Sequence, residues 1–180
     1  MKKFLTTFIF SSLTLLVLAQ AYTPVTEGSK VYFVIKNLGI NTGGTFGGLE
    51  GTINFNPADP TTANFDINVD AGTVDTDIEN RDKHLRKEEY FNVEKYPKIN
   101  FKSSKVTKTN SKDFLYMFGN ITIKGVSKEI KFPFKATPKD DGLLFEGNFK
   151  LNRRDFGVGG NSLSLSDELT VTLSVFAKKN

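Results

Sequence analysis

The segment RDKHLRKEEYF, residues 81–91, contains the only histidine of the chain, His84, among charged side chains. On a helix, Arg81 and Glu88 would share a face with His84, at positions i−3 and i+4. A carboxylate beside an imidazole fixes its tautomer, which suits an acid or base in catalysis. The same side chains could instead tie the helix to the rest of the fold, or contact the polar head of a ligand. The residues alone therefore leave three roles open for His84.

Few other residues are suited to catalysis. The chain has no cysteine and one histidine, which excludes thiolate nucleophiles and metal sites built from Cys or several His. It contains no Gly-x-Ser-x-Gly, His-Glu-x-x-His, P-loop or dinucleotide-binding motif. No serine lies in a nucleophile context, and no carboxylate pair of the glycosidase kind stands out. We therefore expect a protein that is not an enzyme and needs no metal or cofactor.

A second concentration of polar side chains lies in LNRRDFGVGG, where Arg153, Arg154 and Asp155 follow an apolar run and precede glycines. The planar guanidinium group suits bidentate binding of carboxylate or phosphate. One interpretation is an internal salt bridge, to Asp82 or Glu88 of the predicted helix. The other is a clamp for an anionic head group at the mouth of a cavity.

Alternation of apolar and polar residues dominates the chain after residue 22. It is strict in ANFDINVDA and recurs in EIKFPFKA and LTVTLSVFAK, and turn-forming residues separate such runs. The pattern predicts an all-β fold of about eight antiparallel strands, joined mostly by short hairpins. These would close into a barrel, with a two-sheet sandwich as the alternative. Pro133 within EIKFPFKA predicts a sheet edge or a bulge.

The segment from Asp77 to Phe91 breaks this alternation and contains neither glycine nor proline. It predicts one short helix over the barrel, capped by Asp77 and with basic residues in its later turns. Ile78 and Leu85 would form a thin apolar stripe, so most of the helix would face water. Tyr90 and Phe91 would anchor its end.

The first 21 residues differ in kind from the rest. Lys2 and Lys3 precede an apolar run, which ends with Ala19 and Ala21 around one glutamine. This order is typical of a secretory signal cut after Ala21, whereas a membrane span needs about 20 apolar residues. We therefore expect one domain, residues 22–180, in the periplasm or secreted, without a stable membrane anchor after cleavage.

The charge balance argues against nucleic acid as a partner. The chain holds 24 Lys and Arg against 20 Asp and Glu, and Lys2 and Lys3 belong to the predicted signal. No block of five or six like charges occurs in the sequence.

The apolar residues are rich in phenylalanine, with 17 Phe and no Trp. Phe has no polar group, so this number predicts a wide apolar interior. An eight-stranded barrel is either filled by its side chains or holds one small ligand, and the Phe content favours a cavity. The residues expected to line it are Phe33, Ile35, Phe46, Phe65, Ile67, Phe101, Phe132, Phe134 and Phe149.

Four segments together carry a resemblance to a known family. They are VYFVIKNLGINTGGTFGGLEGTINF, VDTDIENRDKHLRKEEYFNVEKYPKINFKS, GNITIKGVSKEIKFPF and NRRDFGVGG. In this order the chain resembles the YceI-like family of secreted bacterial proteins, over almost all of the predicted mature domain. The family motifs fall on Arg81, Asp82, His84 and Leu85, and on Arg153, Asp155, Phe156 and Gly157.

The resemblance implies a lipocalin-like antiparallel barrel around an elongated apolar cavity. It implies a long isoprenoid, a quinone-like lipid or a fatty amide as ligand, which the protein would sequester or carry. Arg81, Asp82, His84, Arg153 and Asp155 would then contact the ligand head or hold the helix to the barrel. The alternative is an enzyme that uses His84 as acid or base on a lipid-like substrate.

Two departures from the family pattern bear on the ligand head. The family commonly has a histidine where this chain has Asn37, and TEGSK stands where a D-x-x-H-S segment is usual. Head-group preference is therefore expected to differ from that of relatives. An exposed strand edge at Pro133, or an apolar rim, could also support a homodimer.

Overall fold

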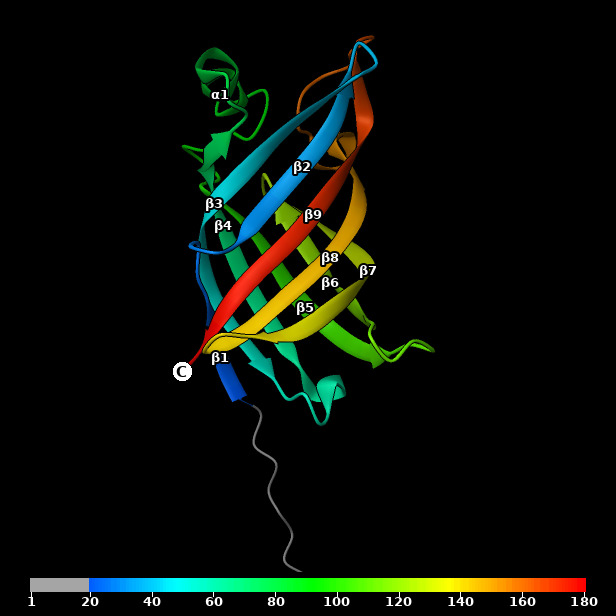
Figure 1. Ribbon diagram of the computed structural model, residues 1–180. Helices are drawn as coiled ribbons and strands as arrows, with labels where there is room; N and C mark the ends of the chain where they lie inside the picture. Colours follow the sequence, from blue (N-terminus) through cyan, green and yellow to red (C-terminus); the bar gives the residue numbers. More distant parts are fainter. Residues whose placement is uncertain (1–19) are drawn as a thin grey trace, which may run out of the picture.

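The computed structural model describes residues 20–180, which form nine strands, one α-helix and two short 3-10 helices (Figure 1). The strands are β1 (Gln20–Pro24), β2 (Lys30–Asn37), β3 (Ile40–Phe55), β4 (Asn64–Asp75), β5 (Lys98–Lys108), β6 (Leu115–Ile123), β7 (Val126–Lys139), β8 (Gly142–Asn152) and β9 (Leu165–Lys179). The helices are η1 (Pro60–Thr62), α1 (Glu79–Leu85) and η2 (Arg153–Phe156). Among residues 20–180, no helix has the length and apolar character needed to cross a membrane.

Eight of the strands close into an antiparallel barrel, which confirms the predicted all-β fold and excludes the two-sheet sandwich. Each strand from β3 to β8 pairs with the next along the chain, and the β2–β3 and β2–β9 pairings close the ring. Tight hairpins join β2 to β3, β6 to β7 and β7 to β8, as the turn residues predict.

The ninth strand, β1, was not expected, because it begins inside the predicted signal segment. It pairs with β3 on one side and β9 on the other, so it continues the position of β2 beyond the break at residues 25–29. Tyr22 of β1 is 4% exposed, and this burial raises the pKa of its hydroxyl. The rest of the predicted signal, residues 1–19, lies outside the described residues, and cleavage after Ala21 stays a prediction.

Pro133 lies where β7 loses one of its neighbours. Residues 126–134 of β7 pair with β6, but pairing with β8 begins only at Phe134, opposite Gly147. A residue without an N–H is tolerated at such an edge. The sheet edge predicted from the sequence at Pro133 is therefore present.

Phenylalanine rings fill the end of the barrel that carries β1 and η1. The Phe65 ring lies edge-on to those of Phe134 and Phe145, at centroid distances of 5.9 and 5.3 Å, and Phe55 packs on Phe145 at 5.4 Å. Edge-to-face pairs of this kind contribute about 0.5–1.5 kcal/mol each beyond their burial. This cluster closes one end of the barrel.

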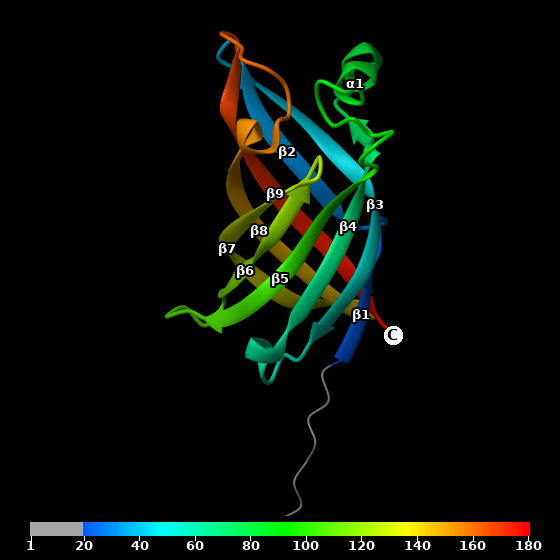
Figure 2. The same cartoon turned by 180° about the vertical axis from the view of Figure 1, so that it is seen from behind.

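The helix lies at the opposite end, beside β4 and apart from the β2–β3 hairpin (Figures 1 and 2). It is shorter than predicted and begins at Glu79, with Ile78 at the N-cap and no side-chain cap. Asp77 was expected to cap it but has a φ of 61° and precedes the cap. After Leu85 the chain folds into turns, and the Arg86 side chain at the C-cap donates to the Gly72 and Val74 carbonyl oxygens of β4.

Candidate functional site

A cavity of about 410 Å³ occupies the half of the barrel nearer α1. Its walls are the inward-facing apolar side chains of all eight barrel strands, β2 to β9, which alternate with outward polar ones. Several of these side chains are only half-buried although they point into the barrel, among them Phe33, Ile67, Phe101, Leu169 and Leu173. Such residues face open space inside the barrel, whereas those at the filled end are fully buried.

Seven of the nine residues expected to line a cavity do so: Phe33, Ile35, Phe46, Ile67, Phe101, Phe132 and Phe149. The other two do not. Phe65 and Phe134 are 3% and 2% exposed and belong to the cluster that fills the β1 end. Alternation reveals which face of a strand points inward, but not how far along the barrel axis a residue lies. That is why these two predictions were wrong.

The sequence interpretation missed part of the wall on β9. Leu169, Val171, Leu173 and Val175 line the cavity, although none was among the predicted lining residues. Their alternation in LTVTLSVFAK already placed them on one face of a strand. The emphasis on phenylalanine, rather than a lack of signal, left them out.

The segment that follows α1 closes one side of the cavity mouth. Leu85, Tyr90 and Phe91 line the cavity, and the Phe91 ring packs edge-on against Phe46 of β3 at 5.2 Å. The predicted anchoring by Tyr90 and Phe91 is therefore present in the structure. η2 and the residues after it close the opposite side, with Phe156 and Val158 in the wall.

Arg81 and Asp82 fasten α1 to the end of β4. Asp82 is 7% exposed, and its Oδ1 accepts from the Thr76 N–H at 2.9 Å and the Thr76 hydroxyl at 2.5 Å. Arg81 donates from Nε to the Thr76 hydroxyl and from Nη2 to the Thr76 carbonyl oxygen, both at 2.7 Å. Thr76 thus donates hydrogen bonds to Asp82 and accepts hydrogen bonds from Arg81. Arg81 also lines the cavity, whereas Asp82 does not.

His84 lies at the mouth, with about half of its side chain exposed. Its Nδ1 is 3.6 Å from Glu89 Oε1, which is too long for a hydrogen bond, and its ring centroid is 4.9 Å from that of Tyr90. Glu88 was expected as the neighbouring carboxylate. Because the helix ends at Leu85 and the chain turns back, Glu89 takes that place.

Arg153 is used inside the fold and not as an open clamp. The side chain is 4% exposed, and all five of its N–H groups have a protein acceptor. The acceptors are the Ser166, Val158, Gly160 and Leu165 carbonyl oxygens and Asp167 Oδ1. The ion pair with Asp167, at 2.8 Å, replaces the predicted pair with Asp82 or Glu88. Asp155 is exposed and does not line the cavity.

Polar groups at the cavity mouth are few. Arg81, His84, Asn37, Thr76 and the buried Arg153 line it among apolar side chains. Within residues 20–180, no three His, Cys, Asp or Glu side chains gather where they could hold a metal ion. The arrangement suits an elongated apolar molecule whose polar end lies near α1.

Loss of the Asp82 carboxylate is expected to loosen α1 without unfolding the barrel. Asp82→Ala leaves the Thr76 N–H and hydroxyl without their buried acceptor, at a cost of about 1–3 kcal/mol. Hydrogen exchange should then quicken in residues 79–96 and stay slow in β5 to β9. Lys83→Ala is the matched control, since it removes only an exposed pair with Glu79 worth about 0.5 kcal/mol or less. Equal exchange in the two variants would contradict the assigned role of Asp82.

Comparison with known proteins agrees with this architecture. Residues 22–177 match the YceI-like domain, and protein YceI of Salmonella agona (strain SL483) is 33% identical over 187 residues, 97% of each protein. The structure of BcnA from Burkholderia cenocepacia is similar with a TM-score of 0.80 at 22% identity, over 85% of this chain and 98% of BcnA. A polyisoprenoid binding domain from Saccharophagus degradans gives a TM-score of 0.70 at 13% identity, over 90% of this chain and 99% of that domain. The match over nearly all of the described residues shows that this chain belongs to the YceI-like family.

Proposed function

We propose that this protein binds a long apolar lipid in its barrel and sequesters or carries it. The observation that carries the proposal is the cavity of about 410 Å³, whose wall is apolar except for a few groups at the mouth. Burial of an alkyl or isoprenoid chain contributes about 0.8 kcal/mol per CH₂. Several isoprene units would therefore bind tightly without a charged contact. An isoprenoid, a quinone-like lipid or a fatty amide fits this description.

The orientation of the ligand follows from the two ends of the barrel. The Phe65–Phe134–Phe145 cluster closes one end, so the tail would point towards it. The head would lie near Arg81, His84 and Asn37 at the mouth. Arg153 has no free donor, so head-group contacts are assigned to these three residues.

Two further observations support this function. A structural neighbour, the domain from Saccharophagus degradans, is described as a polyisoprenoid binding domain. The N-terminal basic and apolar segment, with its small residues before Tyr22, supports export to the periplasm or beyond. Binding and transport of lipid outside the cytoplasm would account for both the structural neighbour and the N-terminal segment.

Native mass spectrometry of the purified protein tests the proposal. We expect one bound lipid per protein molecule, which disappears after extraction with organic solvent and returns on incubation with a long-chain isoprenol. His84→Ala should keep the lipid to within about threefold, because the cavity wall and not one polar contact supplies the affinity. A protein free of lipid in repeated preparations, and unable to take up the isoprenol, would refute the proposal. Chemical conversion of the bound lipid that is lost in His84→Ala would favour an enzyme.

A further inference from the structure

Positive charge is concentrated in one continuous part of the chain. Residues 98–139, which span β5, β6 and β7, hold ten lysines and two acidic residues, a net charge of +8. The other described residues hold 12 basic and 18 acidic residues, a net charge of −6. Although the net charge of the whole chain is small, positive and negative charges are therefore distributed very unevenly over the molecule. One side of the barrel is basic and the remainder is acidic.

Strand register places part of this charge on one outer surface. Met117 and Phe132 are buried inside the barrel, so their neighbours Phe118 and Lys131 point outward. Phe118 pairs with Lys105 of β5 on one side and with Lys131 of β7 on the other. A phenylalanine thus lies between two lysines across three adjacent strands, which Figure 2 shows side by side.

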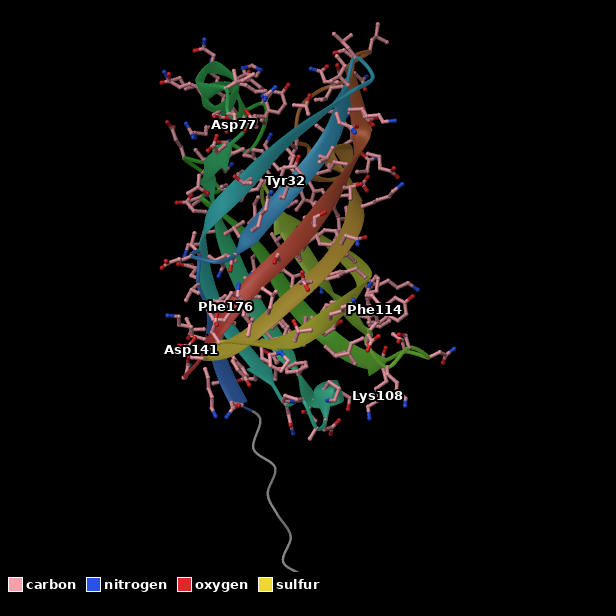
Figure 3. All side chains as sticks on the ribbon, in the orientation of Figure 1. Tyr32, Asp77, Lys108, Phe114, Asp141 and Phe176 are labelled. Carbon is pink, nitrogen blue, oxygen red and sulfur yellow. The ribbon has the colours of Figure 1, made fainter. Side chains whose placement is uncertain are left out.

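The same surface continues to the start of β6 with two exposed aromatic residues, Tyr116 on the strand and Phe114 just before it. Tyr116 is 40% exposed and pairs with Pro133, and its ring centroid is 6.4 Å from that of Phe118. Phe114 is 38% exposed and lies on the outside of the barrel near the β5–β6 hairpin (Figure 3). The Lys135 ammonium group sits 4.6 Å from the centre of the Phe114 ring. We call Lys105, Phe114, Tyr116, Phe118, Lys131 and Lys135 the basic aromatic face.

The lysines of this face are free of ion pairs with any residue that the structure describes. Three other exposed lysines of the barrel are paired, Lys98 with Glu50, Lys102 with Asp66 and Lys150 with Glu168. Lys105, Lys131 and Lys135 have no carboxylate in such a position. Their charge is therefore available to an external anionic partner.

We propose that the basic aromatic face docks the protein on an anionic lipid bilayer. Lysines near such a surface are attracted by about 1 kcal/mol each, and their alkyl stems lie along apolar surface while the ammonium stays in water. Exposed aromatic rings prefer the boundary between headgroups and acyl chains. Charge complementarity orients the molecule, because the acidic remainder of the barrel is repelled by the same membrane.

The residue types favour a bilayer over nucleic acid. Residues 98–139 contain no arginine, the side chain whose planar fork binds phosphates in two places. Docking does not depend on the contents of the cavity. Docking is a property separate from lipid binding, and it would bring the protein to the membrane surface where a carried lipid is exchanged.

Sedimentation with vesicles tests the docking. The purified protein is mixed with vesicles of phosphatidylcholine alone or with about 30% phosphatidylglycerol, at low and high salt. We expect binding at least about tenfold tighter to the anionic vesicles, with the difference lost near 1 M salt. Lys105→Glu with Lys131→Glu should weaken this binding at least about tenfold. Phe114→Ser with Tyr116→Ser should weaken it several-fold at unchanged charge.

The matched control is Lys36→Glu with Lys178→Glu, which makes the same change in net charge on exposed residues of β2 and β9. We expect this control to bind within about threefold of the unchanged protein. If the Lys105 and Lys131 double variant and this control lost vesicle binding equally, net charge alone would explain the binding, and this result would overturn the proposal. So would the absence of binding to anionic vesicles, or a preference for a single-stranded oligonucleotide that the Lys105 and Lys131 changes abolish. Lipid content, measured by mass spectrometry on the same samples, separates failure of docking from failure of the cavity.

Discussion

Ile67→Trp combined with Leu169→Trp is expected to empty the protein of its lipid while the barrel stays folded. Both side chains point into the cavity from different walls, on β4 and β9, and both are only half-buried. Two indole groups would take up much of a space of about 410 Å³. Bound lipid in native mass spectra should fall at least about tenfold, since most of the buried apolar contact is lost. The free energy of unfolding should change by no more than about 1–3 kcal/mol, because the rings enter open space and not a packed core.

The control for this experiment is Thr172→Trp, at an exposed position of β9 next to cavity-lining residues. It adds the same ring to the outside of the same strand, so lipid content should stay unchanged. A filled-cavity variant that still carries a full complement of the same lipid would place the ligand outside the barrel. Loss of lipid in Thr172→Trp as well would show that the effect comes from damage to the strand.

The general fold could be predicted because alternation fixes the inward face of each strand. In ANFDINVDA, Phe65 and Ile67 both point inward, as the pattern requires. The structure then separates them, since Phe65 is packed among rings at the closed end and Ile67 faces the cavity. Their difference depends on which strands cross at each level of the barrel. That information lies in the strand register and not in any single run.

The helix segment shows a different limit. Its charges suggested a helix up to Phe91, but the helix ends at Leu85, and the Arg86 side chain that follows bonds to two carbonyl groups of β4. A thin apolar stripe, with Ile78 51% exposed, offers little packing to hold further turns. The motif residues were nevertheless in the right region, and Arg81 and Asp82 link the helix to Thr76. Local charge patterns could not reveal that these side chains bond to Thr76 and to the backbone of β4.

The basic aromatic face could not be recognised from the sequence, for a related reason. Lysines in β5 and β7 are spaced singly, so no run of like charge occurs. Pairing of the two strands with β6 brings Lys105 and Lys131 to either side of Phe118. Composition argued against an anionic partner of the nucleic-acid type. The register supplies the reason to consider an anionic surface of another kind.

Arg153→Met is expected to be the most destabilising single change considered, because it removes five side-chain hydrogen bonds that hold the loop after η2. The Val158, Gly160 and Ser166 carbonyl oxygens and the Asp167 carboxylate would lose their buried partner. Removing one partner of a buried, hydrogen-bonded charge costs about 3–5 kcal/mol. Urea unfolding should therefore show a clearly lower midpoint with an unchanged slope. Arg153→Lys should recover less than half of the loss, since an ammonium group has three donors and cannot satisfy the five acceptors of the guanidinium group.

Arg154→Met provides the comparison, because that guanidinium bonds only to the exposed Asn161 side chain and its loss should cost about 0.5 kcal/mol or less. Equal destabilisation by Arg153→Met and Arg154→Met would show that the buried bonds contribute no net stability. Lipid content in Arg153→Lys separates the two roles that the sequence left open for this arginine. A folded Arg153→Lys protein that keeps its lipid assigns Arg153 to the fold, since all its donors already have acceptors. A folded variant that loses only its lipid would return Arg153 to the ligand's head group.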